Sequence, residues 1–272
     1  MIKEKNNHKE LKDLTLLDRF LFAEAVEDQE TLEIILEIIL GRDVILKHLP
    51  QAEKEARAFR WGKYVKLDVW AKDIDENVYD AEVQKKDTKD LPKRSRLYNG
   101  VIDSKLMKSG SKTYNELNDV FIIIIAPFDL FGKGLYKYTF EMMCEEYPGI
   151  KLEDGATRIF LNTRGTDPTG VSDELIELLM YFETTVSKTE RAASSEKIRK
   201  LQDKIDEIKS NEEIGERYMN LWEEIELERQ EAYEEGQKEK SFDTALKMKE
   251  DNMPVETIAK YTGLSKEEIE KL

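Results

Sequence analysis

Two short segments of the chain alternate between apolar and polar side chains and lie only a few residues apart. They span 64–71 and 78–85, and residues 73–77 between them are rich in the Asp and Asn side chains that favour turns. Alternation with a period of two predicts β-strands, because successive strand side chains point to opposite faces of a sheet. The pattern therefore predicts a β-hairpin and a fold that contains a sheet.

Helical and strand patterns surround this hairpin. A turn residue, Gly41, ends the first helical region, and Asp28 marks a break within it; Pro92 suits the first turn of the helix after the hairpin. The predicted elements in chain order are helices over 15–40, a short strand at 44–49, the hairpin, a basic helix over 91–107, a buried strand over 120–126, strands at 136–142 and 158–161, and a helix over 171–186. This order predicts an α/β core with a mixed sheet flanked by helices.

The composition restricts the chemistry that the chain can perform. Its 272 residues, 40% of them apolar, are enough for one large core with an appendage. The single cysteine, Cys144, excludes an internal disulfide framework, and two histidines argue against a histidine-rich metal site. A bound metal is therefore expected to be a hard cation held by carboxylates.

Charge is spread unevenly along the chain. The net charge of -15 argues against a general polyanion binder. Residues 82–112, however, hold nine Lys or Arg against four Asp or Glu, whereas 187–251 hold thirteen against nineteen. The net charge of the whole chain therefore does not exclude nucleic-acid binding by its locally basic middle. Residues 1–13 lack the apolar stretch of a signal peptide and the run 121–126 is too short to span a bilayer, so we expect a cytoplasmic protein without membrane contact.

The last third of the chain differs in composition from the rest. After Ser187, Gly and Pro almost vanish and charges of both signs alternate, which predicts a charged helical extension over 187–251. Residues 252–272 predict a small helical hairpin around Gly263, with Ser265 and Glu268 as a capping box. The last helix is not basic, so packing or a homo-oligomer contact is favoured over DNA reading. The expected domains are 14–186, 187–251 and 252–272.

Two carboxylates occupy matched positions on the hairpin. Asp68 and Glu82 are equally far from its turn, so they are expected on facing positions of adjacent strands, with Cβ atoms about 4.5–5.5 Å apart. Carboxylates this close repel each other unless a proton or a cation lies between them. Gln84 shares their face. From alternation alone an ordinary solvated face is favoured, since half of all strand residues face outward; the order of the surrounding elements is what shifts the balance toward a site.

That order and several local stretches resemble the PD-(D/E)XK nuclease superfamily, and more narrowly the Rpn family of recombination-promoting nucleases and transposases. The stretches that carry the resemblance are 14–20, 36–42, 67–69, 79–84, 94–98, 102–104, 120–124, 154–155 and 159–162. The resemblance implies a restriction-endonuclease-like core, DNA as partner, and DNA cleavage that depends on Mg²⁺, with Mn²⁺ as an alternative ion. It also implies a role near recombination.

The resemblance assigns roles to single residues. Asp68 and Glu82 match the two motif acids that would bind the metal, and Gln84 stands where the wider superfamily has Lys. Lys85 is adjacent, but the strand parity directs it to the other face. An acid on the first helix is often a further ligand in the superfamily, and Glu24 is the candidate here.

The basic helix after the hairpin supplies candidates for DNA contact. Arg94 and Arg96 can bind phosphate and Tyr98 can stack or hydrogen bond, although a solvated helix face explains them equally well. Three functions remain open: a metal-dependent DNA nuclease, a catalytically weak nucleic-acid-binding or interaction protein that retains the nuclease fold, and a nuclease of the toxin or defence kind. The intact set of Asp68, Glu82 and Gln84 favours an enzyme.

Overall fold

The computed structural model describes residues 9–48, 51–56, 65–107, 113–187, 190 and 192–272, and for 51–56 and 65–69 the backbone only. The chain divides into two compact units, Met1–Asn211 and Glu212–Leu272. Each unit has a hydrophobic core of its own.

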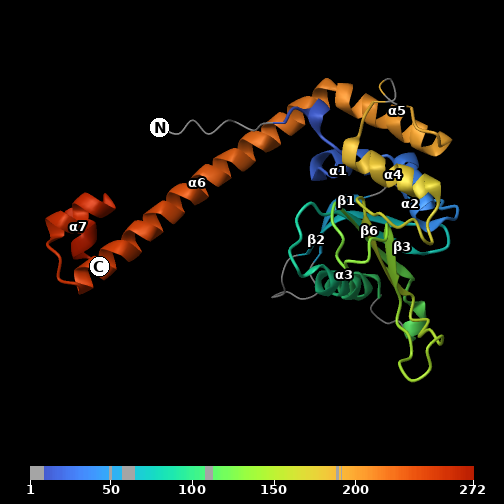
Figure 1. Cartoon of the computed structure of the whole chain (residues 1–272), viewed down its shortest axis with the longest axis horizontal. Helices are drawn as coiled ribbons and strands as arrows, with labels where there is room; N and C mark the ends of the chain where they lie inside the picture. Colours follow the sequence, from blue (N-terminus) through green and yellow to red (C-terminus); the bar gives the residue numbers. More distant parts are fainter. Residues whose placement is uncertain (1–8, 49–50, 57–64, 108–112, 188–189, 191) are drawn as a thin grey trace. The chain divides into compact units, whose positions relative to one another are not determined.

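A six-stranded mixed sheet forms the centre of the first unit (Figure 1). Its strand order is β1-β2-β3-β4-β6-β5; β3, β4 and β6 run parallel, and the other neighbours pair antiparallel. The strands are β1 (Gln51–Ala56), β2 (Val65–Lys72), β3 (Val78–Val83), β4 (Val120–Ala126), β5 (Lys137–Phe140) and β6 (Ala156–Asn162). Every residue of β3 is buried, as expected for a parallel strand covered on both faces.

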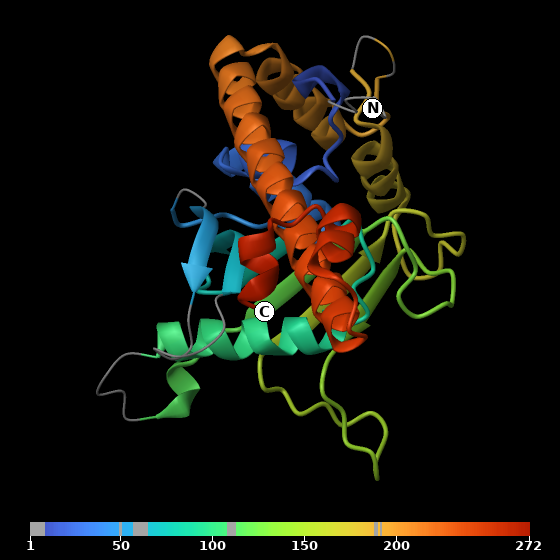
Figure 2. The same ribbon diagram turned by 90° about the vertical axis from the view of Figure 1, so that its left-hand side faces the viewer.

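Helices cover both faces of this sheet. Helix α3 (Leu91–Leu106) lies on one face, where Tyr98, Val101 and Ile102 pack against Ile122 and Ile124 of β4. Helices α1 (Arg19–Val26), α2 (Gln29–Leu40) and α4 (Asp173–Thr184) lie on the other side of the sheet (Figures 1 and 2). The predicted fold class, a mixed sheet flanked by helices, is confirmed.

The helix boundaries follow the local chemistry. Asp28 accepts the Thr31 backbone N–H at the start of α2, so the predicted break in the first helical region is real. Gly41 ends α2 with a left-handed φ of 69°. The predicted strand over 44–49 was wrong for the part that the structure describes, because only an isolated bridge from Leu46 to Asp73 forms there; residue 49 lies outside the described residues.

Helix α5 (Glu196–Ser210) belongs to the first unit. Its side chains Ile198, Leu201 and Ile205 are fully buried, and Lys197 forms an ion pair of 2.9 Å with Glu37 of α2. The boundary expected at residue 187 therefore lies within this unit, and the two units divide after Asn211.

The second unit consists of one long helix and two short ones. They are α6 (Glu212–Glu250), α7 (Val255–Thr262) and α8 (Lys266–Glu270). Ala245, Ile258, Leu264 and Ile269 form the small core that joins them. Ser265 and Glu268 form the predicted capping box at the start of α8.

Among the helices that the structure describes, none is both long enough and apolar enough to cross a membrane.

Candidate active site

The predicted hairpin is formed by β2 and β3. Their printed register pairs Val69 with Ala81 and Trp70 with Asp80 in antiparallel order. Continued by one residue pair, this register sets the backbone of Asp68 opposite that of Glu82. The Asp68 side chain lies outside the described residues, so the shared cation between the two carboxylates stays a prediction.

Glu82 is buried beneath α3. Its side chain is only 3% exposed, so it does not belong to a solvated face of the hairpin. The parity of β3 directs it to the same side of the sheet as Val78, which packs in the core under α3. A buried carboxylate requires a positive partner, because an unpaired charge in an apolar interior is costly.

Arg94 of α3 supplies that positive charge. Its Nη2 atom donates hydrogen bonds to Glu82 Oε2 at 2.9 Å and to Gln84 Oε1 at 2.8 Å. The side-chain amide of Gln84 in turn donates to the carbonyl oxygen of Lys86 at 2.6 Å, which orients its Oε1 toward Arg94. Glu82 and Gln84 thus direct two oxygen atoms at one cationic nitrogen.

Tyr98 completes this group of side chains one helical turn beyond Arg94. The guanidinium carbon of Arg94 lies 5.7 Å from the centre of the Tyr98 ring. Burial raises the pKa of the Tyr98 hydroxyl, and the neighbouring Glu82 carboxylate raises it further. The ring is 7% exposed and belongs to the core under α3. Of the three residues predicted to contact DNA, Arg94 points to Glu82, Tyr98 is buried and Arg96 is exposed.

Two features of this group were not predicted from the sequence. Asp80, two residues before Glu82 on the same face, is fully buried, and its negative charge also raises the pKa of Tyr98. The parity of β3 could have identified it. The second feature is the contact from Arg94 to Glu82, which the sequence signals only through a basic helix that follows the acidic strand.

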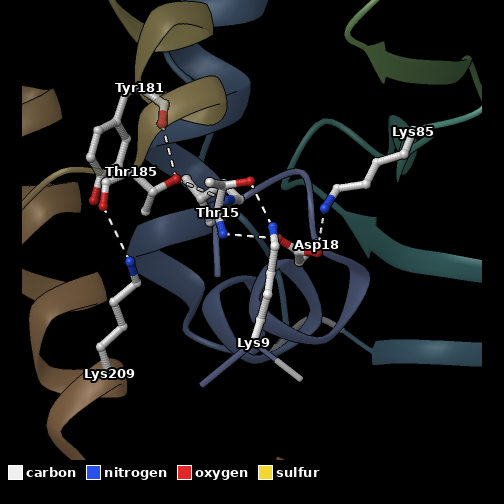
Figure 3. Close-up of polar contacts among 8 residues, drawn as sticks. Lys9, Thr15, Asp18, Lys85, Tyr181, Thr185 and Lys209 are labelled. Atoms are coloured by element: carbon white, nitrogen blue, oxygen red, sulfur yellow. Dashed lines mark hydrogen bonds and ion pairs between the residues drawn. The ribbon is translucent and has the colours of Figure 1, made fainter. Parts of the chain in front are cut away.

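Lys85 faces away from this group. It forms an ion pair with Asp18 just before α1, and Asp18 also accepts the backbone N–H of Thr15 at 2.9 Å (Figure 3). Burial alone would raise the pKa of Asp18, but the hydrogen bonds from Lys85 and Thr15 lower it below its ordinary value. Lys85 is thus engaged with Asp18.

Glu24 lies in the middle of α1 and is half-buried. Helix α1 packs against β1 and against β2, the strand that contains Asp68. Helix α1 covers the side of the sheet opposite to α3, whereas Glu82 faces α3, so the structure does not bring Glu24 to the face of the sheet that holds Glu82. Among the side chains that the structure describes, which do not include Asp68, no three His, Cys, Asp or Glu residues converge on one point.

The donor atoms of this site suit a hard divalent cation. Carboxylate and amide oxygens are the ligands that Mg²⁺ and Mn²⁺ prefer, and Mg²⁺ sites in proteins often use only one or two carboxylates. The cationic nitrogen of Arg94 lies where Glu82 Oε2 and Gln84 Oε1 converge. Glu82 and Gln84, with Asp68 beside them in register, therefore fit a metal centre.

Comparison with known families agrees with this chemistry. A family model described as PD-(D/E)XK nuclease family transposase matches residues 16–251 of the chain. No curated protein and no solved structure gives a significant match.

Proposed function

We propose that this chain, which belongs to the PD-(D/E)XK nuclease transposase family, is an endonuclease. It would hydrolyse DNA phosphodiester bonds with a divalent metal ion, Mg²⁺ or Mn²⁺. Its biological role would be in recombination or in the movement of mobile elements. The observation that supports this proposal best is the convergence of Glu82 Oε2 and Gln84 Oε1 on one cationic nitrogen at the end of the hairpin.

In this proposal the hairpin holds the metal. Asp68 and Glu82 supply the negative charge. A bound Mg²⁺ or Mn²⁺ would act as a Lewis acid on the phosphate and favour ionisation of the attacking water. Gln84 would orient that water or a phosphate oxygen through its side-chain amide, which the carbonyl of Lys86 already holds in place.

The basic surface beside the hairpin would hold the DNA backbone. Arg96 is exposed on α3, and Lys93 is exposed on the same first turns of the helix. Both can contact phosphates without displacing any described side chain of the site. Such contacts carry no sequence information, so they would position DNA and not select a target.

A plasmid assay tests the proposal. Wild-type protein should nick or linearise closed circular DNA with Mg²⁺ or Mn²⁺, and EDTA should abolish the reaction; an exonuclease would leave a closed circle intact. Asp68→Asn and Glu82→Gln keep the side-chain shape but remove the charge that would hold the ion, so each should abolish most cleavage. Asp75→Asn is a matched control, because it removes one charge from the exposed turn of the same hairpin.

The outcomes separate the proposal from its main alternative. Wild-type protein that binds DNA but cuts it with neither ion would favour a binding module that retains the nuclease fold. Cleavage that survives both substitutions at Asp68 and Glu82 would mean that other residues are catalytic.

The same proposal places the protein in the cytoplasm. It also assigns homo-oligomer contacts to the C-terminal helices, and light scattering of the full chain would check the oligomeric state.

A further inference from the structure

One nitrogen atom of Arg94 lies beside the carboxylate that would hold a metal ion in the proposed site. Its Nη2 lies 2.9 Å from Glu82 Oε2 and 2.8 Å from Gln84 Oε1, and both oxygens belong to the proposed metal site. The Glu82 side chain is 3% exposed and that of Arg94 is 23% exposed. Without a bound metal, the positive charge that balances the buried Glu82 carboxylate therefore comes from the protein itself, through Arg94.

We propose that Arg94 is an internal counter-cation that a divalent metal displaces, so that metal binding frees the guanidinium for a DNA phosphate. This inference rests on the proposed function, since it concerns the regulation of the same site. It differs from a simple phosphate contact, because it makes Arg94 available to DNA only after the metal has bound.

Electrostatics gives the reason for displacement. A divalent ion and the guanidinium would compete for the carboxylate of Glu82, and two cations beside one carboxylate repel each other. The repulsion is strong here because Glu82 is buried, and charges in the protein interior are screened less than charges in water. The ion carries the larger charge, and its ligands would include the carboxylate of Asp68.

The hydrogen bonding of Arg94 gives the reason why it can leave. Arginine binds a carboxylate most strongly through two parallel hydrogen bonds, whereas Arg94 meets Glu82 through one nitrogen that it shares with Gln84. Its Nε atom is buried and donates to no acceptor within the described part of the chain. A buried donor without an acceptor is destabilising. In its metal-free position Arg94 thus leaves one hydrogen-bond donor unused among the described residues. Because the side chain is partly exposed, it also has a route to solvent.

Displacement couples the two binding events. If the metal must displace Arg94, then a phosphate that captures the freed guanidinium will raise the affinity for the metal. Linkage requires the metal to raise the affinity for DNA by the same factor. The protein would therefore bind metal weakly without DNA and tightly with it. As a result, only protein that is already bound to DNA would carry the metal.

Calorimetric titration of the full-length protein with Mn²⁺ in the absence of DNA tests this inference. The proteins compared are wild type, Arg94→Met, and the control Arg96→Met, which removes the same charge from an exposed position two residues along the same helix. Arg94→Met should bind Mn²⁺ about 10-fold more tightly, because a hydrogen bond to a charged group of this kind contributes roughly that factor. Arg96→Met should stay within about twofold of wild type.

The outcomes distinguish this inference from the proposed function. Equal or weaker Mn²⁺ binding by Arg94→Met would overturn the inference and would make Arg94 a positioning residue that stays in place beside the ion. Absence of Mn²⁺ binding in every protein, Arg94→Met included, would also overturn the inference, whereas the plasmid assay, in which DNA is present, tests the proposed function separately.

A second measurement applies if Arg94→Met does not fold. The Nε–H resonance of Arg94, assigned by its loss in Arg94→Lys, should exchange slowly with water in metal-free wild-type protein, because this atom is buried. Added Mg²⁺ should accelerate that exchange strongly. Protection that persists at saturating Mg²⁺ would show that the guanidinium does not leave.

Discussion

The side-chain oxygen of Thr185 accepts a hydrogen bond of 2.8 Å from the backbone N–H of Leu16, a residue 169 positions earlier in the chain. The same hydroxyl donates to the carbonyl oxygen of Tyr181 at 3.0 Å. Thr185 adopts a left-handed φ of 43° just after α4 and is 3% exposed. This contact joins the segment before α1 to the end of α4 and so links two helices on one side of the sheet.

Loss of this hydroxyl should destabilise the first unit. Thr185→Ala leaves the N–H of fully buried Leu16 without its acceptor, which is expected to lower the free energy of unfolding by about 1–3 kcal/mol. Thr185→Ser keeps the hydroxyl and should recover most of this loss. Urea unfolding followed by circular dichroism measures both. Thr184→Ala is the control, because the Thr184 hydroxyl donates only to the carbonyl of Met180 in its own helix; equal stability of the two alanine variants would contradict the prediction.

The ion pair between Asp18 and Lys85 should make stability depend on pH in the acid range. The pKa of Asp18 in the folded protein is lowered below its ordinary value of 3.8, so the ionised form stabilises the folded state at neutral pH. Asp18→Asn should therefore cost about 1 kcal/mol at pH 7. The contribution is fully present above pH 3.8 and is lost as the pH falls through the lowered pKa, so wild type and variant should converge there. A constant difference between their unfolding midpoints from pH 7 to pH 3 would exclude this role.

The division between the two units predicts which truncation folds. A chain that ends at Asn211 keeps α5 and should stay folded and retain metal-dependent cleavage. A chain that ends at Val186 loses the buried side chains Ile198, Leu201 and Ile205, each of which contributes about 1.5–3 kcal/mol by its burial. Their sum approaches the whole stability of a typical domain, so this shorter chain should unfold. Thermal melts of the two fragments decide the matter, and a cooperative melt for the shorter chain would refute the assignment of α5 to the first unit.

Gln84 should matter for cleavage more than for stability. Gln84→Leu removes the oxygen that accepts from Arg94 and the amide that donates to Lys86. Cleavage should fall about 10- to 100-fold, which is the usual cost of losing a group that orients a metal site. The melting temperature should change little, because the side chain is only partly buried. Lys86→Ala serves as control, since it removes an exposed side chain but keeps the carbonyl that Gln84 contacts; equal loss in both variants would show that cleavage responds to any change in this segment and not to the Gln84 side chain.

Local patterns determined much of the fold. Period-two alternation located β2 and β3, the apolar run located β4 with its observed bounds, and cap residues located the ends of α2 and the start of α8. These features depend on neighbours within a few residues, and such neighbours are visible in any sequence. The pattern also placed Glu82 and Gln84 on one face, since strand parity needs no tertiary information.

The tertiary structure decided what depends on contacts between distant segments. The residues of β1, from Gln51 to Ala56, have no strand-like alternation and form a strand through pairing with β2. Charge alternation made α5 look like part of an exposed extension, but its apolar stripe packs in the first unit. Arg94 is the clearest case. The sequence around Arg94 predicts a basic helix suited to contact DNA, yet the packing of α3 on the sheet directs the Arg94 guanidinium to Glu82. The direction of a helical side chain is set by how the helix packs, which the residue type does not reveal.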